Sequence, residues 1–193
     1  GGVGVLLAGS YGLTVKQVDF DAPPITDLDL NYGTGFAAKA HDSILKKLKT
    51  PKAGLMLFHG APGTGKSTYL KYLTSVIGRQ FIFIPVSMAG ELSSPSFIKL
   101  LMGYSDSILV LEDAEQALQS REKDFWNSST VSTLLNMSDG ILESGSETDA
   151  VCAASAEMAL NAGSVFALDA DANVRHGLKL LEFGDSGGGT MLG

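Results

Sequence analysis

Gly60-Ala61-Pro62-Gly63-Thr64-Gly65-Lys66-Ser67 matches the phosphate-binding pattern G-x-x-x-x-G-K-[ST] at every fixed position. Its glycines allow successive backbone N–H groups to turn inward around a phosphate chain, because residues without a Cβ reach the required dihedral angles at low cost. Lys66 is predicted to place its charge on the β- and γ-phosphates, and Ser67 to place its hydroxyl on Mg²⁺. The predicted phosphate-binding residues are Gly60, Ala61, Pro62, Gly63, Thr64, Gly65, Lys66, Ser67 and Thr68.

The segments on either side of this loop predict a strand before it and a helix after it. Residues 55–58 (LMLF) are a short apolar run, typical of a strand buried on both faces. Beyond the loop, Leu70, Leu73 and Ile77 recur at helical spacing, and Gly78 favours a stop. Because a helix N-terminus also attracts anions, this context favours a phosphate site over a purely structural glycine turn.

Further elements predict an α/β fold. Apolar runs at 81–86 and 108–111 indicate two more buried strands, and residues 36–49 and 95–102 carry the spacing of helices. Pro85 marks the end of the first of these strands. Strands that alternate with helices favour a mostly parallel sheet with helices on both faces, where ligands gather at the carboxyl ends of the strands.

An acidic motif follows the last of these strands. Residues 108–111 lead directly into Glu112 and Asp113, with Glu115 close behind, and Glu112 lies 46 residues after Lys66. A carboxylate at the end of a strand beside a phosphate loop can hold Mg²⁺ through water and orient an attacking water molecule. The spacing therefore favours a second half of the same site over an ordinary solvated strand end.

Composition limits the class of protein. The chain has 193 residues, 45% of them hydrophobic, which is enough for one buried core. Its formal charge of −7 argues against a general polyanion binder and favours a protein substrate or partner over nucleic acid. The basic residues Lys46, Lys47, Lys49 and Lys52 are interpreted as complementing the C-terminus of the helix over 36–49.

The single cysteine and the hydropathy pattern indicate a cytoplasmic protein. Cys152 cannot form an internal disulfide, so a reducing compartment is the simpler assumption. No apolar run reaches the roughly 20 residues that a membrane helix needs, so no membrane segment is expected.

With these motifs in place, the chain from about Asp27 to Leu142 resembles the AAA ATPases. Residues 87–92, 107–115 and 133–140 are most similar to the branch that includes the mitochondrial translocase of the Rieske protein and related bacterial and phage ATPases. The resemblance implies a three-layer P-loop NTPase core that uses ATP and Mg²⁺. It also implies a homo-oligomeric ring with ATP between neighbouring subunits, and hydrolysis that remodels a macromolecular substrate.

The resemblance also assigns roles. Lys66 and Ser67 take the phosphate and Mg²⁺ positions, Glu112 falls where the family's metal-side acid lies, and Asp113 falls where its water-polarising acid lies. The usual order is Asp then Glu, so the two acids are swapped here. The shorter Asp113 must approach its water more closely, so hydrolysis is expected while its rate is left open.

The carboxyl-terminal third departs from the family pattern. Residues 143–158 are interpreted as an insertion, and residues 163–169 as a displaced sensor strand with Asp169 in the sensor position. Arg175 resembles the arginine finger that acts on a neighbour's phosphate, but Leu178 replaces the second arginine of that segment. No helical lid domain is recognised. The alternative interpretation is that 143–193 is a misread, disordered tail.

We therefore divide the chain into an irregular lead (1–26), an AAA ATPase core (27–142) and an atypical tail (143–193). Residues 25–35 are interpreted as a linker into the core. The first functional hypothesis is ATP hydrolysis with Lys66, Glu112 and Asp113 as catalytic residues. The second is a nucleotide-binding interaction module with little turnover, and a small-molecule kinase is the third.

Overall fold

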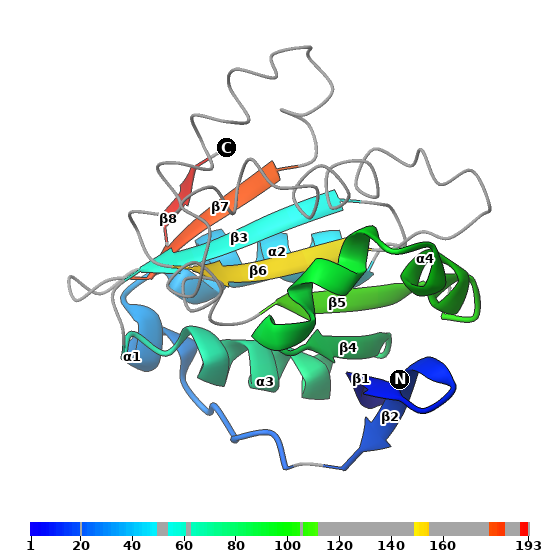
Figure 1. Ribbon diagram of the computed structural model, residues 1–193. Coiled ribbons are helices and arrows are strands. Elements are labelled where there is room, and N and C mark those ends of the chain that lie inside the picture. Colours follow the sequence, from blue (N-terminus) through cyan, green and yellow to red (C-terminus); the bar gives the residue numbers. More distant parts are fainter. Residues whose placement is uncertain are drawn as a thin grey trace, which may run out of the picture.

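One mixed sheet forms the centre of the protein (Figure 1). The computed structural model describes residues 1–19, 21–49, 54–60, 63–104, 106–111, 149–154, 178–183 and 190–192. The elements within these ranges are β1 (Val3–Gly9), β2 (Gly12–Val18), α1 (Leu28–Tyr32), η1 (Ala37–His41), α2 (Asp42–Lys49), β3 (Gly54–Gly60), α3 (Lys66–Val76), β4 (Gln80–Ile84), η2 (Val86–Ser93), α4 (Pro95–Met102), β5 (Ser107–Leu111), β6 (Asp149–Ala154), β7 (Leu178–Phe183) and β8 (Thr190–Leu192).

The described strands follow the order β2-β1-β4-β5-β6-β3-β7-β8. Each neighbouring pair from β1 to β7 is parallel, whereas β2 and β8 at the two edges pair antiparallel with their neighbours. The strands predicted at 55–58, 81–86 and 108–111 are β3, β4 and β5, the second ending at Ile84 before Pro85. The predicted α/β fold with a mostly parallel sheet is confirmed.

Helices cover both faces of this sheet. In Figure 1, α2 lies behind the sheet and α4 in front of it. Phe81, Ile108 and Val110 belong to the same buried cluster as residues of α2 and α3. Ile82 and Leu109 alternate with them along β4 and β5 and are also buried, so they point to the opposite face. The arrangement is a three-layer core.

Two predicted helices are observed and one begins differently. The helix predicted over 95–102 is α4, whose N-cap Ser94 accepts a hydrogen bond from the N–H of Phe97 at 3.2 Å. The helix predicted after the phosphate loop is α3. The helix predicted over 36–49 begins with the π-helical turn η1 before α2. Ala40 and His41 at the end of this turn are both buried.

The amino-terminal segment corrects two expectations. Residues 1–26, expected to be an irregular or weakly strand-like lead, contain the β1–β2 hairpin, and β1 extends the sheet beyond β4. Residues 25–35, expected to be a linker, contain α1. The hairpin strand β1 is held by pairing with β4, about 80 residues away in the chain, so local sequence pattern carries little information about it.

Candidate nucleotide-binding site

The predicted phosphate loop follows a strand at the interior of the sheet. β3 pairs in parallel with β6 on one side and with β7 on the other, and Phe58 within it is fully buried. Gly60 ends β3 beside Phe183, the last residue of β7. The loop therefore leaves the carboxyl edge of a parallel sheet, where ligands bind in such folds. Ala61 and Pro62 lie outside the described residues.

Two loop glycines have backbone conformations that favour glycine, and one of them, Gly65, is a fixed position of the pattern. Gly63 has φ +78° and Gly65 has φ +89°, which side chains of L-residues rarely adopt. A Cβ on Gly63 would meet no atom within 4 Å, so the space beside that backbone is open. A Cβ on Gly65 would lie 2.9 Å from Cε1 of Tyr32. Both the positive φ angle and the nearby Tyr32 ring therefore disfavour any residue other than glycine at position 65.

The loop opens into the N-terminus of α3. Gly65 is the N-cap and supplies no side-chain hydrogen bond, and the N–H of Tyr69 donates to the Gly65 carbonyl at 2.9 Å to begin the helical ladder. The preceding N–H groups of a first turn have no acceptor within their own helix, and the helix dipole favours an anion there. Ser67 and Thr68 are exposed and Lys66 is partly buried. This glycine-lined loop end at the start of α3 therefore has a backbone arrangement that favours an anion.

Tyr32, which sequence reasoning missed, lies against this loop. It is the last residue of α1, its side chain is buried, and its hydroxyl donates to the Gly65 carbonyl at 3.3 Å. Its ring lies 4.9 Å from that of Phe36 and 5.4 Å from that of Tyr69, centroid to centroid. Figure 1 shows α1 beside the first turn of α3. In the sequence, Tyr32 lies in a segment interpreted as a linker, and no local pattern indicates its contact with Gly65.

Asp29 organises the turn that follows Tyr32. Its carboxylate accepts hydrogen bonds from the backbone N–H groups of Ala37 at 2.8 Å and Gly35 at 3.1 Å. These two bonds lower the pKa of Asp29, because they stabilise its ionised form. Asp27 caps α1 by accepting from the N–H of Leu30 at 3.0 Å. The acids at 27 and 29 therefore build a defined helix and turn.

A second buried polar contact lies behind the first turn of α3. Nδ1 of His41 and the hydroxyl of Tyr69 are 2.7 Å apart, and Tyr69 is fully buried while His41 is 7% exposed. Burial raises the pKa of Tyr69, so its neutral hydroxyl is the donor. Burial lowers the pKa of His41, and the nearby Lys49 adds to this effect while Asp42 opposes it. A neutral His41 accepting from Tyr69 is the arrangement that follows.

This arrangement predicts a loss of stability in mild acid. As the pH falls below about 6.5, the usual pKa of histidine, the unfolded chain binds a proton at His41 before the folded protein does. The free energy of unfolding should therefore decrease until the pH has passed the lower folded pKa. We expect a greater loss of stability between pH 7.5 and 5.5 in the wild type than in His41→Asn, measured by urea unfolding. Asn keeps an acceptor near Nδ1 and does not titrate, so equal losses would contradict the assignment.

The strand that precedes the predicted acids ends at the same edge of the sheet. Leu111 of β5 pairs with Cys152 of β6, and Cys152 pairs with Leu57 of β3. β5 and β3 are therefore separated by one strand, about 10 Å between their axes. Glu112 and Asp113 follow β5 directly and lie outside the described residues. Among the described side chains, no group of three or more His, Cys, Asp or Glu could hold a metal ion.

The strand between β3 and β5 comes from a segment that was interpreted as an insertion. Residues 149–154 form β6, within the range 143–158, and pair with both neighbours over their length. Residues 150–154 (AVCAA) are apolar but mostly small, unlike the runs of large apolar residues that indicated β3, β4 and β5, and they were not predicted as a strand. The displaced sensor strand predicted at 163–169, with Asp169, lies outside the described residues, as does Arg175.

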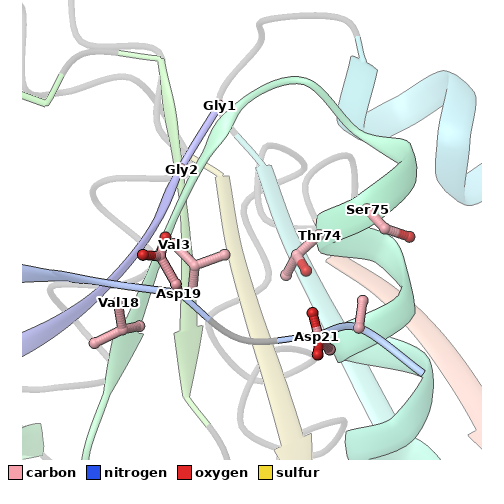
Figure 2. A pocket seen from close by; sticks show the side chains of 9 residues that line it. Gly1, Gly2, Val3, Val18, Asp19, Asp21, Thr74 and Ser75 are labelled. Carbon is pink, nitrogen blue, oxygen red and sulfur yellow. The ribbon is translucent and has the colours of Figure 1, made fainter.

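A pocket of about 670 Å³ lies elsewhere in the molecule (Figure 2). It is lined by the β1–β2 hairpin, the segment after it, and Thr74 and Ser75 in the last turn of α3. The length of α3 places it about 15 Å from Lys66. The hydroxyls of Thr74 and Ser75 donate to carbonyls within α3, each at 2.7 Å. The pocket contains none of the predicted phosphate-binding residues.

Within the part of the chain that the structure describes, no helix combines the length and apolar character that a membrane span requires.

Comparison with known proteins identifies a family. Comparison with curated proteins gives no match. The sequence model of the ATPase family associated with various cellular activities (AAA) matches residues 56–164, more than half of the chain. The match begins in β3 and includes the phosphate loop, α3, β4, β5 and β6. This family supports nucleotide binding and an ATPase type of activity, typically with Mg²⁺. Together with the loop geometry and the parallel sheet, the match shows that the chain belongs to the AAA family of ATPases.

Proposed function

We propose that the chain binds Mg·ATP at Gly60–Thr68 and hydrolyses it. The observation that carries this proposal is the loop itself, in which Gly63 and Gly65 hold positive φ angles between an interior parallel strand and the N-terminus of α3. An open cradle of backbone N–H groups followed by a lysine and a hydroxyl suits a triphosphate better than any other common ligand.

In this proposal Lys66, Ser67 and Glu112 bind Mg·ATP, and Asp113 takes part in the hydrolysis. Lys66 would neutralise charge on the β- and γ-phosphates, and Ser67 with Glu112 would hold the metal ion. Bound Mg²⁺ would neutralise part of the charge that develops on the phosphates. Asp113 orients the attacking water and accepts its proton. The parallel register of β3, β6 and β5 supports this division, because it brings the end of the acidic strand to the loop's edge of the sheet.

We further propose a setting for this activity. The resemblance of residues 87–92 and 107–115 favours the branch that includes the Rieske-protein translocase, with a homo-oligomeric ring in which ATP binds between subunits. Hydrolysis would then remodel a macromolecule, and the charge of −7 favours a protein as that substrate. The single cysteine favours a cytoplasmic location.

Asp113→Asn tests the catalytic assignment. The amide cannot accept the proton of water, so turnover should fall about 100-fold or more while the affinity for Mg·ATP stays within about threefold of the wild type. Phosphate release and equilibrium binding measure the two effects, and Glu115→Gln serves as a control that should retain turnover. Loss of turnover in Asp169→Asn, with an active Asp113→Asn, would show that the role is assigned to the wrong acid.

A second candidate function is a nucleotide-binding interaction module with little turnover. The swapped order of Glu112 and Asp113 and the replacement of a family arginine by Leu178 favour it. Binding of Mg·ATP without phosphate release, at every protein concentration and equally in wild type and Asp113→Asn, would support this second function instead.

A further inference from the structure

Tyr32 holds the phosphate loop through the oxygen that begins α3. The Gly65 carbonyl accepts from the N–H of Tyr69 at 2.9 Å and from the hydroxyl of Tyr32 at 3.3 Å. The first of these bonds is the start of the helical ladder. The second bond comes from α1, so Tyr32 contacts Gly65 from outside the phosphate loop.

Tyr32 approaches Gly65 with two groups, its hydroxyl and the edge of its ring. An oxygen-to-oxygen distance of 3.3 Å is longer than the 2.5–3.0 Å of a strong hydroxyl bond, so this hydrogen bond is weak. The ring edge occupies the side-chain position of Gly65, because an added Cβ there would lie 2.9 Å from Cε1 of Tyr32 and 3.4 Å from its hydroxyl oxygen. The ring edge therefore fills the space beside the Gly65 backbone, and we expect it to contribute more than the hydroxyl.

Tyr32 is itself fixed from several directions. The carboxylate of Asp29 binds the backbone at Gly35 and Ala37, and Gly33 donates to the carbonyl of Asp29 at 2.8 Å. The rings of Phe36 and Tyr69 pack against it. Burial raises the pKa of Tyr32 to about 12, so its hydroxyl stays protonated and able to donate near neutral pH. A side chain locked in this way can set the position of a neighbouring backbone.

We propose that Tyr32 is a positioning residue for nucleotide binding, which places Gly65 so that Lys66 and the N–H groups of the first turn of α3 face the phosphates. This proposal rests on the proposed binding of Mg·ATP at the loop. Tyr32 touches the loop backbone and acts on the nucleotide through it, so its loss should change loop order before any ligand is added.

The first test is amide hydrogen exchange in the nucleotide-free protein. Tyr32→Leu removes the ring edge and should raise the exchange of the Tyr69 N–H about tenfold relative to that of the β4 core, since that N–H bonds the same Gly65 oxygen. Tyr32→Phe keeps the ring and should raise it only about twofold to threefold. Phe97→Leu is the control, because Phe97 is also fully buried but belongs to α4, on the other face of the sheet.

The second test is the dissociation constant of Mg·ADP, measured with the same variants at temperatures where all are folded. Tyr32→Leu should weaken binding about tenfold, Tyr32→Phe about twofold, and Phe97→Leu not at all. In Tyr32→Leu, an unchanged exchange rate of the Tyr69 N–H would overturn the positioning role of Tyr32. An unchanged affinity for Mg·ADP in this variant would overturn it as well. Equal weakening in Phe97→Leu would overturn it too, because the effect would then follow general stability. If the wild type binds no nucleotide, the proposed function fails, and exchange at Tyr69 still decides whether Tyr32 orders the loop.

Discussion

Lys66→Ala is expected to weaken the binding of Mg·ATP about 100-fold, or to remove it. Hydrogen bonds to charged groups contribute about 1.5–3 kcal/mol each, and 1.4 kcal/mol corresponds to a tenfold change in affinity. The loop backbone would remain, with Gly63 and Gly65 in their present conformations, but the cation that neutralises the β- and γ-phosphates would be lost. Equilibrium titration with a fluorescent ATP analogue measures the effect.

Lys71→Ala is the matched control for this variant. Lys71 belongs to the same helix, carries the same charge and is exposed, so its removal should leave affinity unchanged within about twofold. Equal weakening in the two variants would mean that long-range charge alone attracts the nucleotide. Wild-type affinity in Lys66→Ala would place the phosphates elsewhere.

Arg79→Met is expected to lower the free energy of unfolding by about 3 kcal/mol. Arg79 is 8% exposed, and its guanidinium donates to the carbonyl oxygens of Leu48 at 2.8 Å, Asp106 at 3.0 Å and Ser107 at 3.2 Å. These bonds join the end of α2 to the starts of β4 and β5. Methionine fills similar space but leaves these carbonyls without that donor. Urea unfolding of the two proteins measures the difference.

The carboxylate of Asp106, which pairs with Arg79, should contribute much less to the free energy of unfolding than the guanidinium does. Nε of Arg79 lies 3.0 Å from Oδ1 of Asp106, but the Asp106 side chain is 51% exposed, so solvent screens the pair. Asp106 has φ +68°, a conformation that asparagine also tolerates. Asp106→Asn should therefore cost less than about 1 kcal/mol. A larger loss in Asp106→Asn than in Arg79→Met would show that the ion pair, and not the carbonyl bonds, stabilises this end of the sheet.

The sequence predicted the parts of the fold whose signals are local. Apolar runs typical of buried strands identified β3, β4 and β5, and the helix predicted over 95–102, with Pro95 in its first turn, is α4 with its observed bounds. The loop glycines predicted backbone dihedral angles that residues with a Cβ reach only at a cost, and Gly63 and Gly65 adopt such positive φ angles. In each of these cases the physical cause lies within a few residues of the element it produces.

Features held by distant contacts were not predicted. The strand β1 depends on pairing with β4, and β6 depends on having a strand on each side, so neither needs a strong local pattern. Asp29 was read as part of a linker, because nothing in the sequence shows that its carboxylate binds the backbone at Gly35 and Ala37. Tyr32 was missed for the same reason, since its partner Gly65 lies 33 residues further along the chain.

The candidate site also has a part with a local sequence signal and a part whose roles stay predictions. The phosphate loop was identified from consecutive residues, and Gly63 and Gly65 within it have positive φ angles, while its binding of phosphate stays a prediction. The roles of Glu112 and Asp113 follow from the strand that precedes them, and they remain predictions, as do those of Asp169 and Arg175.

Steady-state phosphate release from Mg·ATP, at a series of protein concentrations and beside Lys66→Ala, tests the central claim that the chain is an ATPase. We expect turnover that is lost in Lys66→Ala and that rises more than linearly with protein concentration, because the proposed ring would complete the site between subunits. Wild-type protein that binds Mg·ATP without releasing phosphate at any concentration, or release that persists in Lys66→Ala, would contradict it.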